Sequence, residues 1–322
     1  MALTRRRLLG LGTGALLASA MPVFGSDTVR MSGRAFGTTW RIRLRGEGEL
    51  EALGKNLVAL LERIDRSMSP FRADSALTRF NASDTGRHAV DSDLAVVTAE
   101  ALRVAVRTEG AFDPSVGPDV GRYGFGPIHG TRFGTHAGFN SDGETISKLD
   151  GRLTLDLCGI AKGYALDLMA DCIEEAGFGD FVAELGGEVL ARGADLGEAP
   201  WRIGIADPLG NGGLHAVVDI GDLALATSGD AVNSYSVAGR RYSHIIDPRT
   251  DKPVRNSVAS VSVLADSAMT ADALATALMV MGPEAGVAFA ATHGIPALYL
   301  LRTPDGSLDE VASPDYAHHR TS

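Results

Sequence analysis

The residues with the clearest chemical potential lie in the segment T-A-D-A-L-A-T at positions 270–276. Asp272 and Thr276 are four residues apart, so a helix would place both on one face. Their neighbours are small or apolar, and a carboxylate and a hydroxyl on such a face need a partner. A hard cation such as Mg²⁺ suits these oxygen ligands. The structural alternative is that Asp272 is a helix cap or first-turn acid and that Thr276 bonds back to its own helix.

A second reactive group lies in the segment L-T-L-D-L-C-G-I-A-K-G-Y at 153–164. Its apolar alternation ends at Asp156, and Gly159 then opens a predicted helix that carries Lys162. Glycine lets the backbone approach a ligand closely. The N-terminus of a helix favours anions, and a lysine adds a point charge for phosphate. The alternative is an ordinary strand-to-helix connection with an exposed lysine.

A third candidate is His244, which directly precedes the turn that Asp247 and Pro248 predict. An imidazole at this place can act as a general base or contact phosphate. The alternative is a hydrogen-bonded structural histidine.

The hydrophobic pattern predicts how these residues are carried. Helices are expected at 50–68, 92–108, 160–176 and 270–280, with a further short helix closing at Gly294. Strands are expected at 33–44, 151–157, 181–191, 201–206, 214–220, 224–228, 257–264 and 295–302. The glycine-rich stretch 112–140 is predicted to be irregular and to wrap the site, and the tail past Thr303 to be loose. Because no G-x-G-x-x-G follows a strand, we expect a mixed α/β (α+β type) domain with antiparallel strands rather than a doubly wound nucleotide fold.

The first twenty residues have the features of a targeting signal. A twin-arginine pattern, T-R-R-R-L-L at 4–9, precedes an apolar run that ends in A-S-A at 18–20. We therefore predict a signal peptide at 1–20, a single mature domain at 21–322 and a periplasmic location. The alternative is an uncleaved membrane anchor, which would leave the protein membrane-associated.

The charge and the cysteines exclude other classes of protein. Removing three arginines with the signal takes the formal charge from −10 to −13. A domain this acidic is a poor nucleic-acid binder, because phosphate attraction needs clustered Lys and Arg. Two cysteines, Cys158 and Cys172, make no disulfide framework. We expect both to be free and mostly buried.

Eight motifs, in order along the mature chain, resemble the ApbE family of FAD:protein FMN transferases. They are F-G-T-T-W (36–40), M-S-P-F (68–71) with S-A-L-T-R-F-N (75–81), F-D-P-S-V-G-P (112–118), D-L-C-G-I-A-K-G (156–163), L-G-G-E (185–188), T-S-G-D (227–230), H-I-I-D-P-R-T (244–250) and D-A-L-A-T (272–276).

The resemblance implies a T-fold-like architecture, with a mixed, largely antiparallel sheet and packed helices. It also implies a Mg²⁺-dependent reaction in which FMN passes from FAD to a threonine of another protein and AMP is released. The acceptor would be an exported or membrane protein of electron transfer. The same resemblance assigns the metal to the carbonyl of Gly159 and the side chains of Asp272 and Thr276, and catalysis to His244 and Asp272. The residues it assigns to FAD are Phe36, Phe71, Ala111, Phe112, Asp113, Asp156, Lys162 and Ile246.

The chain departs from the family pattern at three positions, none of them a proposed metal ligand. Phe36 replaces a methionine, Cys158 stands where glycine or serine is common, and Asp251 replaces a glycine. Two other functions use the same residues. One is a pyrophosphatase that cuts FAD to FMN and AMP with water, and the other is a flavin-binding module without turnover.

Overall fold

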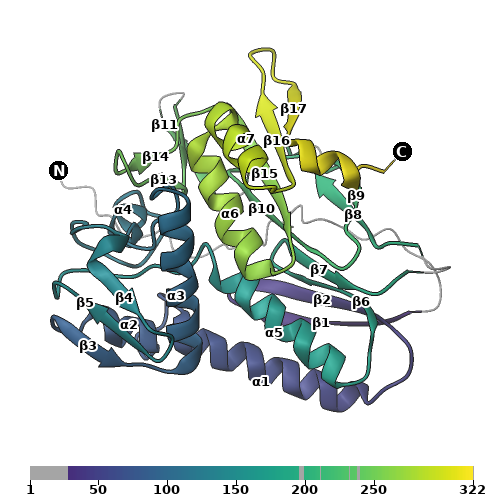
Figure 1. Cartoon of the computed structure of the whole chain (residues 1–322), viewed down its shortest axis with the longest axis horizontal. Helices are drawn as coiled ribbons and strands as arrows, with labels where there is room; N and C mark the ends of the chain where they lie inside the picture. The colour runs from purple at the N-terminus through teal and green to yellow at the C-terminus, as the bar shows by residue number, and fades with distance from the viewer. Residues whose placement is uncertain (1–27, 196–198, 211, 232, 238–239, 322) are drawn as a thin grey trace, which may run out of the picture.

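An eight-stranded sheet, antiparallel at every pairing, runs through the computed structural model (Figure 1). The structure describes residues 28–195, 199–210, 212–231, 233–237 and 240–321, so the predicted signal at 1–20 lies outside it. In spatial order the strands are β1 (Val29–Ala35), β2 (Thr38–Arg45), β6 (Asp180–Leu185), β7 (Glu188–Arg192), β10 (Ala224–Gly229), β15 (Val258–Ala265), β16 (Ala297–Arg302) and β17 (Leu308–Ala312).

Helices pack on the sheet and on one another to form the larger core. They are α1 (Leu50–Met68), α2 (Ala76–Asn81), α3 (Ser92–Arg107), α4 (Gly117–Arg122), α5 (Ala161–Glu175), α6 (Ala268–Met281) and α7 (Pro283–Thr292). Helix α1 is amphipathic and buries Leu53, Leu57, Leu61 and Ile64 at helical spacing. Helix α6 instead is apolar almost all round and contacts β10, β15 and α5. The carboxylate of Asp272 therefore lies inside the core.

The opposite face of the sheet carries a smaller core. Along β6, Phe181 and Ala183 belong to the larger core, whereas Val182 belongs to the smaller one, as the two-residue period of a strand requires. The hairpin of β8 (Arg202–Ala206) and β9 (Leu214–Asp219) covers this second face together with Trp201 and Tyr316.

Three smaller sheets complete the fold. Strands β3 (Gly86–Ala89), β5 (Thr145–Lys148) and β4 (Phe139–Ser141) form a sheet in that order, and a short 3-10 turn (His136–Gly138) precedes β4. Two hairpins lie between β10 and β15 in the sequence: β11 (Ser234–Val237) with β12 (Arg240–Ser243), and β13 (Ile246–Asp247) with β14 (Lys252–Pro253). The second hairpin begins at Ile246, two residues after His244.

Two of the predicted strands are wrong, because each contains a tight turn. The prediction 33–44 is the hairpin β1–β2, in which Phe36 and Gly37 adopt φ values of 50° and 72°. The prediction 181–191 is the hairpin β6–β7, turned by Gly186 and Gly187 at φ values of 60° and 108°. Successive residues with positive φ are typical of tight hairpin turns.

The predicted strand 151–157 is also wrong. Buried and less buried side chains alternate along it as in a strand. Its backbone, however, hydrogen-bonds to side chains and is paired with no neighbouring strand among the described residues. The Asn81 amide donates to the carbonyl of Leu155 at 2.9 Å and accepts from its N–H at 2.8 Å. The buried Lys148 ammonium donates to four carbonyls, among them those of Gly151 (3.1 Å) and Leu153 (3.3 Å). The segment is thus fixed without joining a sheet.

The C-terminal segment is ordered, which corrects the prediction of a loose tail past Thr303. Strand β17 pairs with β16, and a 3-10 helix (Pro314–His319) follows. The buried Tyr316 is part of the smaller core. Over the part of the chain that the structure describes, no helix has the length and apolar character needed to cross a membrane.

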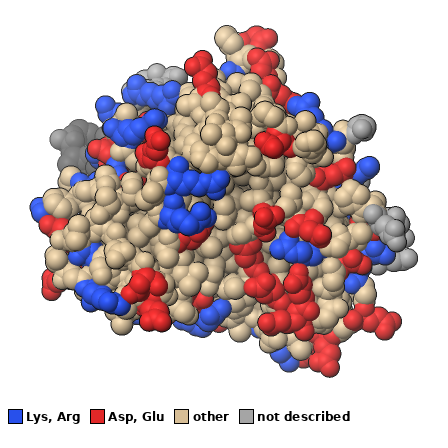
Figure 2. Space-filling view, in the orientation of Figure 1, with Lys and Arg blue, Asp and Glu red and all other residues tan. Residues whose placement is uncertain are grey.

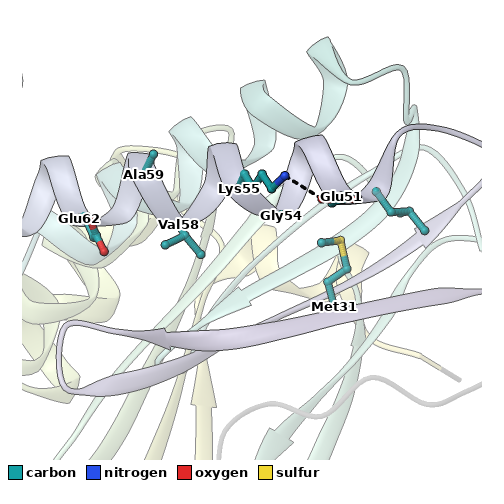
Figure 3. Close-up of a pocket in the computed structure, with 8 residues that line it drawn as sticks. Met31, Glu51, Gly54, Lys55, Val58, Ala59 and Glu62 are labelled. Atoms are coloured by element: carbon teal, nitrogen blue, oxygen red, sulfur yellow. Dashed lines mark hydrogen bonds and ion pairs between the residues drawn. The ribbon is translucent and has the colours of Figure 1, made fainter.

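The surface carries the expected acidic character. Figure 2 shows acidic side chains gathered over the start of α1 and the end of α5, where Glu47, Glu49, Asp171 and Glu174 are exposed. A shallow apolar groove lies between α1 and β1, with Met31, Gly54 and Val58 along it (Figure 3). The groove contains none of the residues selected above for chemistry.

Candidate active site

Helices α5 and α6 meet at the centre of the site. The N–H of Gly163, in the first turn of α5, donates to Oδ2 of Asp272 at 3.2 Å. A Cβ on Gly163 would lie 2.2 Å from the carbonyl oxygen of Ala268, so this close crossing requires glycine. The carboxylate of Asp167 on α5 binds the start of α6, because it accepts from the N–H groups of Ala268 (2.7 Å) and Met269 (3.0 Å). These contacts fix how the two helices align.

Asp272 and Thr276 do not fill the structural roles considered as alternatives. Helix α6 begins at Ala268 with Ser267 as its cap, so Asp272, only 4% exposed, is neither the cap nor a first-turn acid. The Thr276 hydroxyl lies 3.1 Å from that of Ser228 at the end of β10. A Cβ built on Gly159 would be 3.3 Å from Thr276 Oγ1. The structure therefore places Gly159 beside Thr276, with Asp272 one helical turn earlier on α6.

A residue not selected from the sequence, Glu188, completes this centre. It begins β7, directly after the turn of Gly186 and Gly187, and its Oε1 accepts from the Lys162 ammonium. Its other oxygen, Oε2, is buried and has no hydrogen-bond partner within the described residues. The signal in the sequence was the acid at the end of the motif L-G-G-E.

The charges of this centre do not balance. Burial raises the pKa of Glu188 to about 7, and the like charge of Asp272 adds to the rise. Burial likewise raises the pKa of Asp272, against the opposing charge of Lys162. Burial lowers the pKa of Lys162, but Glu188 and Asp272 together raise this pKa by more than burial lowers it, so the ammonium stays charged. Two buried carboxyl groups share one ammonium, so ionising both leaves one negative charge without a partner, and the raised pKa values reflect the cost of that state.

This imbalance fits a bound cation. The oxygens available from Asp272, Thr276 and Gly159 are of the kind that Mg²⁺ prefers. Across the described ranges, no group of three or more His, Cys, Asp or Glu side chains is arranged to hold a metal. Carboxylate, hydroxyl and carbonyl oxygens suit a hard cation better than a transition metal.

The turn before α5 is anchored from the neighbouring loop. The N–H of Asp156 donates to the carbonyl of Pro114 at 2.7 Å, and Oδ1 of Asp156 accepts from the N–H of Cys158 at 3.0 Å. Both cysteines are free, as predicted, but Cys158 is exposed, so its predicted burial is wrong.

His244 lies at the base of the β11–β12 hairpin with one nitrogen occupied. Its backbone N–H donates to the carbonyl of Asn233 at 3.1 Å, and its Nδ1 contacts the same oxygen at 3.0 Å. A carbonyl can only accept, so Nδ1 carries the proton and Nε2 keeps its lone pair. Burial lowers the pKa of His244, and the charge of Lys162 lowers it further. The ring is thus neutral at pH 7 and able to act as a base.

The remaining residues assigned to FAD divide into exposed and buried groups. Phe71 is 70% exposed, and Phe36 lies in the β1–β2 turn. Ala111, Phe112 and Ile246 are buried, and a Cβ on Gly159 would lie 3.4 Å from the Phe112 ring.

Asp113 is buried, and protein partners surround its carboxylate. It accepts from Arg132 at 2.9 Å, from the Ser115 N–H at 2.9 Å and from the His136 N–H at 3.0 Å. Its side chain holds its own loop together, and Arg132 was not among the residues selected from the sequence.

A helix-borne aspartate and threonine, a glycine turn and a half-buried lysine thus lie beside a largely antiparallel sheet. This arrangement has a family counterpart, because residues 36–299 match the model of the ApbE family. The chain belongs to that family, which confirms the resemblance noted from its motifs.

Its relatives cover nearly the whole chain. The FAD:protein FMN transferase of Vibrio cholerae is 39% identical over 306 residues, which are 89% of this chain and 92% of that protein. The Escherichia coli protein of the same name is 31% identical over 94% of this chain and 95% of its own.

Solved structures agree in fold. The flavin transferase ApbE from Vibrio cholerae superposes with a TM-score of 0.83 at 38% identity, over 91% of this chain and 99% of that one. The flavinyl transferase ApbE from Pseudomonas stutzeri, an apo form, gives 0.81 at 29% identity, over 94% and 99%. The predicted α/β fold class is confirmed.

Proposed function

We propose that this enzyme transfers FMN from FAD to a threonine side chain of an exported or membrane acceptor protein, with Mg²⁺, and releases AMP. The observation that carries the proposal is a pair of buried carboxyl groups, Asp272 and Glu188, with the single ammonium of Lys162 between α5 and β7, beside Thr276 and Gly159. An acidic centre can accept the dianionic pyrophosphate of FAD only if a cation is bound there. The names of the ApbE relatives support transfer of flavin to a protein.

The residues divide the work as follows. Asp272, Thr276 and the Gly159 carbonyl would hold Mg²⁺, which supplies positive charge to the pyrophosphate oxygens. Lys162 and the N-terminus of α5 add fixed positive charge on the protein side. His244 Nε2 takes the proton of the acceptor hydroxyl. The threonine oxygen then bonds to the phosphorus of the FMN half, the bridging P–O bond breaks, and AMP leaves with the bridging oxygen.

The proposed acceptor and location rest on the N-terminal sequence and on the chemistry of flavin. The twin-arginine pattern at 4–9 supports export, so the acceptor would be periplasmic or membrane-bound, and electron-transfer proteins fit a covalently bound flavin. If the signal at 1–20 is retained, the enzyme would be anchored at the membrane. The mature part, 21–322, would act as a single domain.

The test follows both products. The mature protein is incubated with FAD, Mg²⁺ and a threonine-bearing peptide, with the matching valine peptide as the control. We expect AMP release together with FMN-sized added mass on the threonine peptide only. AMP with free FMN and an unmodified peptide would show a pyrophosphatase, and no AMP would show a flavin-binding module.

A further inference from the structure

Arg132 is not one of the proposed site residues, but it hydrogen-bonds to two segments that carry them. Its side chain is 7% exposed. The guanidinium donates from Nε to Ser115 Oγ at 3.1 Å and from Nη2 to Asp113 Oδ2 at 2.9 Å. On its other side, Nη1 donates to the Pro248 carbonyl at 2.7 Å and to Asp251 Oδ1 at 2.8 Å. A rigid, planar guanidinium suits such a bridge, because its donors keep fixed directions.

Asp251 holds this guanidinium in spite of an unfavourable backbone. Its φ of 55° lies in the left-handed region, which glycine adopts more easily than residues with a Cβ. Its N–H donates to the Asp247 carbonyl at 2.9 Å, and its own carbonyl accepts from Arg122. Two arginines, Arg122 and Arg132, thus donate hydrogen bonds to this one turn residue. Its side chain contributes the carboxylate that a glycine would lack.

The partners of Arg132 lie directly beside residues of the site. Pro114, between Asp113 and Ser115, is the residue whose carbonyl accepts from the Asp156 N–H at 2.7 Å. Pro248 follows β13, which begins at Ile246, two residues after His244. Arg132 therefore sets the spacing between the segment that carries Asp156 and the segment that carries His244.

We propose that Arg132, held by Asp251, is a positioning residue for FAD. It keeps the two segments at the separation that bound FAD requires. This inference rests on the proposed function, which places FAD against 111–113, Asp156 and Ile246. Arg132 touches none of the reacting atoms in this account, and Asp251 acts only through Arg132.

A double-mutant cycle on FAD affinity tests this role. The dissociation constant is measured by flavin fluorescence with Mg²⁺ for the wild type, Arg132→Lys, Asp251→Gly and the double variant. We expect a rise of about tenfold for Arg132→Lys, a smaller rise for Asp251→Gly, and no further rise in the double variant. Arg87→Lys is the matched control, because Arg87 pairs with Asp142 on an exposed sheet and should leave FAD affinity unchanged.

Unfolding midpoints measured alongside separate positioning from stability. Glycine adopts the left-handed φ freely, so Asp251→Gly should keep its midpoint while it loses FAD affinity. Unchanged FAD affinity in either single variant, or effects that multiply in the double variant, would overturn the proposal. The titration needs neither acceptor nor turnover, so its outcome is separate from transfer to threonine and from AMP release.

Discussion

Replacing Glu188 by glutamine should remove a large pH dependence from the stability of the cation-free protein. The pKa of Glu188 rises from its ordinary 4.5 to about 7 in the folded state. The folded protein therefore holds a proton that the unfolded chain releases, and stability is full below pH 4.5 and lost as the pH rises through 7. At about 1.36 kcal/mol per pH unit, the loss is about 3 kcal/mol.

Urea unfolding in EDTA at pH 5 and pH 8 measures this loss, with the buried Trp40 and Trp201 as fluorescent reporters. The wild type should lose about 2.5 kcal/mol more than Glu188→Gln between the two pH values, because at pH 5 the unfolded chain has already released part of the proton. Added Mg²⁺ should shrink the difference, because a bound cation favours the ionised carboxylates. Equal pH dependence in the two proteins would refute the charge imbalance on which the site rests.

Three further predictions concern other groups. His244→Asn should lower turnover. In the wild type, the rate should begin to drop only below pH 6.5, because the lowered pKa of His244 keeps the imidazole neutral down to that range. A rate that already drops above pH 6.5 would contradict the role of His244 as a base. Asp167→Ala removes the carboxylate that accepts from the first two N–H groups of α6 and should cost about 1 kcal/mol in urea unfolding, with Asp171→Ala on the exposed face of α5 as the control. Lys148→Met takes the ammonium away from four carbonyls, of which that of Phe80 still accepts from Ser83, and should cost about 3 kcal/mol; a neutral effect would contradict the bonding of segment 151–157.

The longer helices were predictable because their signals are local, whereas the six-residue helices α2 and α4 were not predicted, and α4 lies in the stretch 112–140 that was expected to be irregular. The bounds of α1 match the prediction, and α3 begins after the Asp91 cap, since periodic apolar residues and caps act within a few positions. The two hairpins were missed because Phe36 and Gly37, like Gly186 and Gly187, interrupt stretches that otherwise have the composition of strands. The strand at 151–157 failed for a different reason. Its partners are the side chains of Asn81 and Lys148. Asn81 is distant in the sequence, and no local pattern shows that Lys148 donates to this segment.

The candidate site was predictable wherever residue type and spacing carry the chemistry. Asp272, Thr276 and Gly159 could be selected because each stands in a short motif, and the structure places Gly159 beside Thr276. The pairing of Lys162 with Glu188 joins α5 to β7 and depends on tertiary packing. The same holds for the link from Arg132 to Asp251, which spans two loops. Such pairs follow from the fold, so a single sequence does not show them.

The most direct test of the account is the Mg²⁺ dependence of FAD cleavage in Asp272→Asn. AMP release from FAD is titrated with Mg²⁺ in the presence of the threonine-bearing peptide. Asp266→Asn, an exposed acid just before α6, is the matched control. The account predicts Mg²⁺-dependent AMP release for the wild type and the control. For a folded Asp272→Asn variant it predicts loss of turnover at any Mg²⁺ concentration. AMP release by Asp272→Asn with an unchanged Mg²⁺ midpoint, or wild-type release that persists in EDTA, would contradict it.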